Sequence, residues 1–256
     1  MEEAHLAMRR QPKLLVSVKN AAEAKLALNA GVDWIDLKNP DAGPLGAPSP
    51  STAAAVAEEL EAHDYKSAAL GEFCDTDENR LHEIASLFPV AKMGLADCGN
   101  SNWENQFSEY SILCQAADCQ LVPVVYADWE RCNAPSPSTV ANFAVNSKSQ
   151  HLLIDTFHKD ERRLLDYLSE TELGDLIELL NRQQVSVVVA GQLTWQMTER
   201  VIQNFDIYAV AIRGAVCEND RKASLCSRKL EVWVQRFRQF VACNAPNSLA
   251  SPTTNR

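Results

Sequence analysis

Short apolar segments typical of β-strands alternate with helical stretches along almost the whole chain. Eight strands are expected, at residues 13–18, 34–38, 67–70, 90–94, 120–126, 151–155, 185–190 and 207–212. Helical stretches follow several of them, and residues 223–241 form a closing helix. A three-layer α/β sheet usually has fewer strands and a glycine-rich first loop, and no G-x-G-x-x-G motif follows the first strand. The pattern in a chain of 256 residues therefore predicts an α/β protein with a single (β/α)8 barrel.

The barrel is expected to span residues 13–243. Residues 1–12 are predicted to be an N-terminal extension, and residues 244–256 a polar, disordered tail with two prolines. No export signal is visible at the start, and no apolar run approaches the ~18 residues that a membrane span needs. The eight cysteines are then best interpreted as reduced thiols. We expect a soluble, cytoplasmic protein without a membrane partner.

The charge pattern excludes several classes of partner. The formal net charge is −10 and there is no dense basic cluster, so nucleic acid is not an expected partner. No Cys-x-x-Cys pair occurs, and no histidines group with carboxylates at metal-ligand spacing, so neither a metal nor another cofactor is expected. Barrels often assemble through their outer helices, so a homo-oligomer is compatible with the sequence.

The second expected strand ends with two charged residues. Asp36 and Lys38 are two positions apart, so on a strand their side chains point to the same face. Two charges on a buried face cost several kcal/mol unless they are paired or used. They could form a structural ion pair. Alternatively, burial could lower the pKa of Lys38 enough for its amine to act as a Schiff-base nucleophile.

Further polar residues lie at the ends of other strands. In a (β/α)8 barrel the carboxyl ends of the strands form the active-site face. The residues that we expect there are Ser17, Lys92, Asp128, Asp155 and, in the following loop, Lys159. Any single lysine could simply be solvated at a strand end, but Lys92 lies inside a largely apolar run. Several lysines close together lower one another's pKa, which favours the neutral amine that imine formation and proton abstraction require.

Two loops after the last strands are candidate phosphate sites. Gly191 follows the seventh strand, and Arg213 and Gly214 follow the eighth. Glycine lets backbone N–H groups approach an anion, and these two loops often bind phosphate in such barrels. Glycine at a strand-to-helix turn is also a common structural choice.

An ordered series of motifs resembles one known family. The most specific is Asp36-Leu37-Lys38-Asn39-Pro40 followed by Gly43-Pro44-Leu45-Gly46-Ala47. Others follow in order: Lys92-Met93-Gly94-Leu95, Tyr126-Ala127-Asp128, Asp155-Thr156 with Lys159, Ala190-Gly191, and Arg213-Gly214-Ala215 with Cys217. Over roughly residues 13–241 the chain is similar to the (5-formylfuran-3-yl)methyl phosphate synthases, also called 4-(hydroxymethyl)-2-furancarboxaldehyde phosphate synthases. Residues 129–137 and 217–226 depart from the family pattern.

The resemblance implies a fold and an activity. Members of this family are (β/α)8 barrels that join two glyceraldehyde 3-phosphates into a phosphorylated furan aldehyde, on the way to methanofuran-type one-carbon cofactors. The chain would then be a lyase, with a triose phosphate as its small-molecule substrate. By resemblance, Lys38 is the Schiff-base lysine with Asp36 beside it, and Lys92 is an acid/base that isomerises one triose. Asp155 and Lys159 are further active-site positions.

Two alternatives remain open at this point. The chain could be another Schiff-base aldolase that acts on a different sugar phosphate. It could also be a barrel without catalytic activity that binds a phosphorylated metabolite, although all three lysines of the expected site are present.

Overall fold

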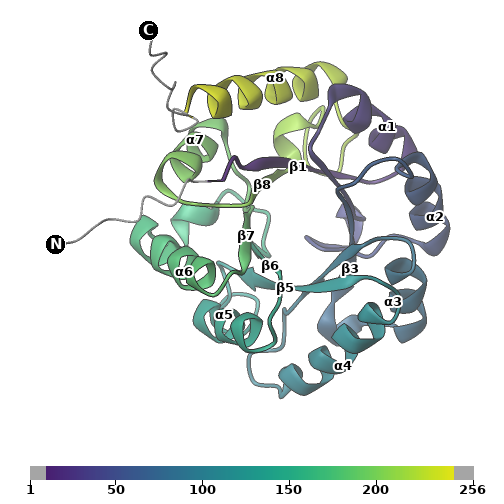
Figure 1. Ribbon diagram of the computed structural model, residues 1–256, viewed down its shortest axis with the longest axis vertical. Coiled ribbons are helices and arrows are strands. Elements are labelled where there is room, and N and C mark those ends of the chain that lie inside the picture. The colour runs from purple at the N-terminus through teal and green to yellow at the C-terminus, as the bar shows by residue number, and fades with distance from the viewer. Residues whose placement is uncertain (1–9, 245–256) are drawn as a thin grey trace, which may run out of the picture.

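Eight parallel strands close into a barrel in the computed structural model, which describes residues 10–244 (Figure 1). Residues 245–256 of the expected tail and residues 1–9 of the expected extension lie outside the described residues. Each strand pairs with its neighbours in sequence, and β8 pairs with β1. The strands are β1 (Lys13–Val18), β2 (Trp34–Leu37), β3 (Lys66–Glu72), β4 (Val90–Gly94), β5 (Gln120–Tyr126), β6 (His151–Asp155), β7 (Ser186–Val189) and β8 (Ala209–Ile212). The prediction of a single (β/α)8 barrel is confirmed.

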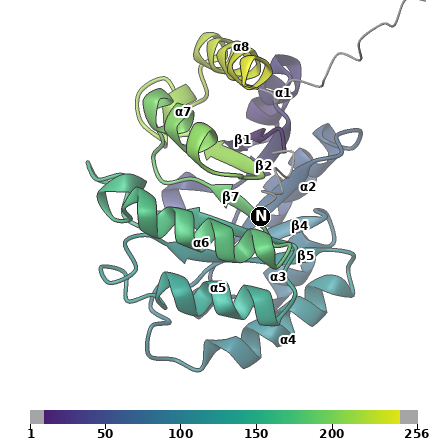
Figure 2. The ribbon, with the colours of Figure 1, turned by 60° about the vertical axis from the view of Figure 1, so that its left-hand side comes forward.

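Helices surround the barrel on all sides (Figures 1 and 2). They are α1 (Ala21–Ala30), α2 (Pro50–Glu59), α3 (Glu78–Ala85), α4 (Trp103–Gln115), α5 (Pro137–Asn146), α6 (Glu170–Arg182), α7 (Trp195–Asn204) and α8 (Ser227–Cys243). Short 3₁₀ turns occur in four of the loops, at Pro40–Ala42, Phe73–Asp75, Leu164–Asp166 and Gly214–Val216. Within residues 10–244, no helix combines the length and the apolar character that crossing a membrane requires.

Apolar side chains form two separate cores. The larger core lies between the strands and the helices, and it includes Val16, Ile35 and Val125. The smaller core fills the barrel interior with side chains of the opposite strand parity, such as Leu15 and Val124. Because strand residues alternate between these two cores, the polar residues at the interior positions near the strand ends come together at one mouth of the barrel.

One sequence string begins two helices. Ala-Pro-Ser-Pro-Ser-Thr occurs at residues 47–52 and again at 134–139. In both copies the first serine is the N-cap: Ser49 Oγ accepts a hydrogen bond from Thr52 N at 3.1 Å, and Ser136 Oγ accepts one from Thr139 N at 3.2 Å. Proline then occupies the first helical turn, where it has no N–H to lose. The N-cap of α2 is therefore Ser49, and that of α5 is Ser136.

Candidate active site

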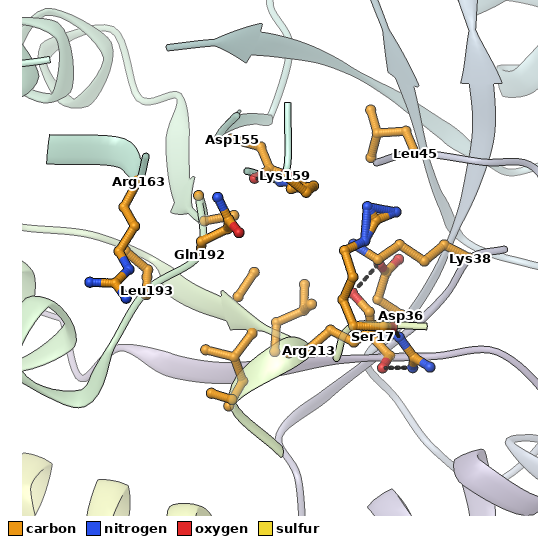
Figure 3. Close-up of a pocket in the computed structure, with 18 of the residues that line it drawn as sticks. Ser17, Asp36, Lys38, Leu45, Asp155, Lys159, Arg163, Gln192, Leu193 and Arg213 are labelled. Atoms are coloured by element: carbon orange, nitrogen blue, oxygen red, sulfur yellow. Dashed lines mark hydrogen bonds and ion pairs between the residues drawn. The ribbon is translucent and has the colours of Figure 1, made fainter. Parts of the chain in front are cut away.

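A cavity of about 400 Å³ opens at the carboxyl ends of the strands (Figure 3). Nine of the ten side chains or glycines predicted for the site line it: Ser17, Asp36, Lys38, Lys92, Asp155, Lys159, Gly191, Arg213 and Gly214. They come from strands β1, β2, β4, β6, β7 and β8 and from the loops that follow them. The structure thus brings together residues that lie up to about 200 positions apart in the chain.

The floor of the cavity holds a buried ion pair. Lys92 on β4 is only 4% exposed, and its Nζ is paired with Asp36 Oδ1 on β2. Two serines complete the network. Ser17 Oγ donates to Asp36 Oδ2 at 3.1 Å, and Ser67 Oγ donates to Asp36 Oδ1 at 2.8 Å. Lys92 Nζ also lies 3.2 Å from Ser67 Oγ. Asp36 therefore has a partner for each carboxylate oxygen, which is what a buried charge requires.

A second lysine–aspartate pair forms another wall of the cavity. Lys159 Nζ donates to Asp155 Oδ1 at 2.6 Å and to Thr156 Oγ1 at 3.2 Å. The backbone N–H of Thr156 also donates to Asp155 Oδ1, at 2.8 Å. Burial alone would raise the pKa of Asp155, but Lys159, Lys38 and these hydrogen bonds hold it below its ordinary value. Asp155 is therefore an anion at neutral pH, and Lys159 is its counter-ion.

Lys38 lies between these two pairs. It is half-buried and reaches into the cavity from the end of β2 (Figure 3). Among residues 10–244, its Nζ makes no hydrogen bond or ion pair. Burial lowers the pKa of Lys38 to about 8; Lys159 and Lys92 also lower it, whereas Asp155 and Asp36 oppose the change. An unpaired amine with this pKa is suited to nucleophilic attack on a carbonyl.

Asp128 is the predicted site residue that does not line the cavity. Its carboxylate accepts hydrogen bonds from the backbone N–H groups of Phe157 at 2.6 Å and His158 at 2.9 Å. It also lies 2.8 Å from Nδ1 of His158. The side chain thus holds the start of the loop that carries Lys159.

Arg213 lines the cavity, but every N–H group of its guanidinium already donates a hydrogen bond within the protein. Its five N–H groups have five acceptors in the protein: the two carboxylate oxygens of Glu23, and the carbonyl oxygens of Ser17, Arg221 and Ala223. Glu23 and Arg213 are 3% and 5% exposed, so this is a buried ion pair between α1 and the loop after β8. The sequence showed Arg213 but not its partner, because the two residues are 190 positions apart.

A hydrogen-bonded Glu72–Tyr126 pair lies on the β3–β5 side of the mouth and was missed by the sequence analysis. Tyr126 Oη donates to Glu72 Oε1 at 2.6 Å, and the backbone N–H of Ala96 donates to Oε2 at 3.1 Å. A β-bulge near Gly71, whose φ is +93°, redirects the end of β3 and so places Glu72 there. Gly94 makes the space, since a Cβ at that position would come within 2.1 Å of Glu72 Oε2. Burial raises the pKa of Glu72, although the two hydrogen bonds act to lower it.

Two arginines of the cavity wall were also missed, Arg163 and Arg221. Both lie in loops, where no periodic pattern marks a residue as inward-facing. For metals, the described part of the chain contains no group of three or more His, Cys, Asp or Glu side chains placed to bind an ion. The lysines and aspartates of this cavity are instead arranged as two ion pairs beside one free amine, that of Lys38.

Comparison with solved structures identifies the fold. Phosphoribosyl anthranilate isomerase from Thermotoga maritima superposes with a TM-score of 0.60 at 16% identity, over 89% of this chain and 99% of that one. A fructose-1,6-biphosphate aldolase homologue from Coccidioides immitis gives a TM-score of 0.62 at 11% identity, over 90% of this chain and 91% of the other. At these identities the likeness shows a shared barrel and nothing about activity.

Comparison of sequences finds closer relatives. The (5-formylfuran-3-yl)methyl phosphate synthase of Methanopyrus kandleri is 29% identical over 218 residues, which is 81% of this chain and 90% of that protein. The enzyme of the same name from Methanosarcina barkeri is 29% identical over 234 residues, which is 86% of this chain and 96% of that protein. The sequence model that describes 4-HFC-P synthases matches residues 14–234, almost the whole barrel. The chain belongs to the 4-HFC-P synthase family.

Proposed function

We propose that the protein is a (5-formylfuran-3-yl)methyl phosphate synthase that condenses two molecules of glyceraldehyde 3-phosphate. The family and the names of the relatives support this reaction class. The observation that carries the proposal is Lys38, a free amine of lowered pKa between two lysine–aspartate pairs. In overall balance, two trioses give the furan aldehyde phosphate, one inorganic phosphate and two waters. The product would serve methanofuran-type cofactor biosynthesis.

Lys38 acts as the Schiff-base nucleophile in this proposal. Its neutral amine adds to the triose carbonyl and water leaves, which forms a protonated imine. The cationic nitrogen then stabilises negative charge on the adjacent carbon, so a proton can be removed there. The lowered pKa supports this role, because at pH 7 about a tenth of an amine with a pKa near 8 is neutral. An ordinary lysine has a neutral fraction about 300-fold smaller.

Lys92 and Asp36 carry the proton transfers at the cavity floor. Lys92 faces the cavity and is hydrogen-bonded to Asp36 and Ser67, so a proton that it accepts or releases has a defined path. We assign to Lys92 the isomerisation of one triose to its ketone form and the deprotonation of the imine, for which the ammonium first passes a proton to the Asp36 carboxylate. Asp36 orients the Lys92 amine and balances its charge when it is protonated.

Lys159, held by Asp155, assists the departure of phosphate. Lys159 is a cation at the edge of the cavity, and its ammonium can donate to a departing phosphate oxygen. Asp155 keeps that ammonium in place and stabilises a positive charge on Lys38 when the imine forms. Asp128 supports this wall indirectly, through the loop that it binds. The backbone around Gly191 and Gly214, together with Ser17, offers polar contacts to the substrates.

The activity can be tested with glyceraldehyde 3-phosphate as the only substrate. We expect a product with the strong ultraviolet absorption of a conjugated furan aldehyde, and one inorganic phosphate for every two trioses consumed. A different Schiff-base aldolase would release no phosphate and give a non-absorbing sugar phosphate. That result would overturn the proposal.

The rate of imine formation should depend on pH through Lys38. Because burial lowers its pKa to about 8, the neutral amine increases about tenfold per pH unit below pH 8 and levels off above it. Borohydride reduction in the presence of glyceraldehyde 3-phosphate, followed by peptide mapping, measures the modification of Lys38 alone. A short peptide with a single lysine provides the control, since the modification of an ordinary amine should keep increasing up to about pH 10. A Lys38 profile that follows the profile of the peptide would contradict the assigned pKa.

A further inference from the structure

Three of the cations that line the cavity are neutralised by carboxylates of the protein. Lys92 is paired with Asp36, Lys159 with Asp155, and Arg213 with Glu23. Lys38 is the proposed nucleophile. Two arginines remain that form no ion pair within residues 10–244, namely Arg163 and Arg221.

Arg221 is the better placed of these two arginines. It is half-buried in the loop between β8 and α8, whereas Arg163 is exposed at the rim, where water and salt weaken binding of an anion. Arg221 Nη2 donates to the carbonyl oxygens of Pro40 at 2.8 Å and Gly43 at 2.7 Å. Its other N–H groups have no acceptor in the described part of the chain. Asp155, Asp41 and Asp220 act on its charge from a distance, but none of them forms an ion pair with it. A partly desolvated cation whose hydrogen-bond partners are neutral carbonyls is a site for an anion from outside.

The loop that carries Arg221 is held rigidly. Arg213 Nε donates to the carbonyl oxygen of Arg221 at 2.6 Å, and Arg213 Nη2 donates to that of Ala223 at 3.0 Å. Asp220 Oδ1 accepts from the backbone N–H groups of Lys222 at 2.7 Å and Ala223 at 3.1 Å. Arg221 is therefore presented to the cavity from a fixed backbone, so little ordering entropy opposes binding.

Arg221 is also linked to the nucleophile. Pro40 and Gly43, which accept its hydrogen bonds, lie in the loop that begins directly after Lys38. An anion bound to Arg221 would sit beside the loop that follows Lys38, on the side of the cavity where the imine forms. Glyceraldehyde 3-phosphate has its phosphate two carbons from the aldehyde, so its two ends need binding groups in one small cavity.

We infer that Arg221 binds the phosphate of the triose that condenses with Lys38, and that Arg213 is a positioning residue that holds the Arg221 loop. The identity of the triose rests on the proposed function, but the anion site itself does not. The planar guanidinium suits a phosphate, which it can bind with two parallel hydrogen bonds.

The test compares Arg221→Gln with wild type and with Arg228→Gln. Arg228 is exposed on α8 and does not line the cavity, so its substitution removes the same charge elsewhere. The readout is the second-order rate of borohydride-trapped imine at Lys38, with glyceraldehyde 3-phosphate and with unphosphorylated glyceraldehyde. Arg221→Gln should lower the rate about 10- to 100-fold with the phosphorylated aldehyde and change it less than about twofold with glyceraldehyde. Arg228→Gln should change neither.

The outcomes separate the two roles that Arg221 could have. If Arg221 merely holds the loop at Pro40 and Gly43, both aldehydes will lose rate equally, and the inference is overturned. Unchanged rates with both aldehydes also overturn it. If even the wild type forms no imine, the proposed function fails, and calorimetric binding of inorganic phosphate then decides about Arg221. Arg221→Gln must bind phosphate at least about tenfold more weakly than Arg228→Gln, and equal affinities would reject the site.

Discussion

Replacing Lys38 with methionine or arginine should lower the turnover rate at least about 10⁴-fold while the protein stays folded. Removal of a covalent nucleophile leaves only the contributions of binding and electrostatics. Methionine keeps most of the length of the side chain but no amine. Arginine keeps a positive charge near Asp155 and Asp36, yet it cannot form the imine. The two variants together separate the covalent role of Lys38 from its charge, and both should give no borohydride adduct at position 38.

Stability provides the control on folding, and the direction of its change can be stated. The pKa of Lys38 is about 8 in the folded protein and about 10.5 in the unfolded chain, because burial disfavours the ammonium. Between these values the unfolded chain binds more protons, so this lysine makes the protein less stable below pH 8 than above pH 10.5. Lys38→Met should therefore be as stable as wild type or up to about 3 kcal/mol more stable at pH 7. The difference should shrink as the pH rises from 8 to 10.5.

Urea unfolding at pH 7 and pH 10 measures this difference, and Lys25→Met is the matched control. Lys25 is exposed on α1, so its substitution should change neither stability nor turnover appreciably. Measurable furan product from Lys38→Arg would exclude the imine route. A Lys38→Met protein that is much less stable than wild type would mean that Lys38 serves mainly as a structural cation.

The barrel and most of the site could be predicted because strand geometry is strongly periodic. Strands β1, β4, β5 and β6 have the bounds that their apolar runs indicated, and side-chain alternation then places Asp36, Lys92 and Asp155 inside the barrel. Once the strands are known, their carboxyl ends must meet at one mouth. This is why nine of the ten predicted residues line one cavity, although the sequence alone does not say which strands are neighbours.

The features that were missed depend on local exceptions or on distant partners. Glu72 reaches the mouth because of the bulge at Gly71, and no hydrophobic pattern reports a bulge. Arg221 lies in a loop without periodicity, and the burial of Arg213 is explained only by Glu23 on α1. Helix α5 could have been found, since residues 134–139 repeat the string that begins α2. Likewise Ser169 and Glu172 form the capping box that begins α6, a signal that the sequence contains.

Lys92→Met should lose both turnover and stability, and a second substitution should restore only the stability. Lys92 and Asp36 are 4% and 2% exposed, so removal of the lysine leaves a carboxylate buried with only the hydroxyl groups of Ser17 and Ser67. Breaking a buried ion pair from one side usually costs about 3–5 kcal/mol, a large share of the about 5–15 kcal/mol that keeps a domain folded. Loss of a proton-transfer group usually costs about 10²–10⁴-fold in rate.

The double variant Lys92→Met/Asp36→Asn removes both charges. The asparagine side chain can still hydrogen-bond to the two serines, so most of the lost stability should return, as judged by urea unfolding. Turnover should not return, because neither new side chain exchanges protons at neutral pH. Full activity of the double variant would show that Lys92 only balances the charge of Asp36.

Borohydride trapping locates the step that Lys92 controls. Lys92 lowers the pKa of Lys38 and Asp36 raises it, so Lys92→Met should shift the pH profile of Lys38 trapping upward, and the double variant should shift it back. Both variants should still form the adduct at Lys38 when the pH is high enough. A protein that forms the imine but releases neither furan nor phosphate would place the action of Lys92 after imine formation, at the removal of the proton. If the adduct is lost at every pH, the two lysines form one nucleophilic unit, and the division of labour between β2 and β4 proposed here is wrong.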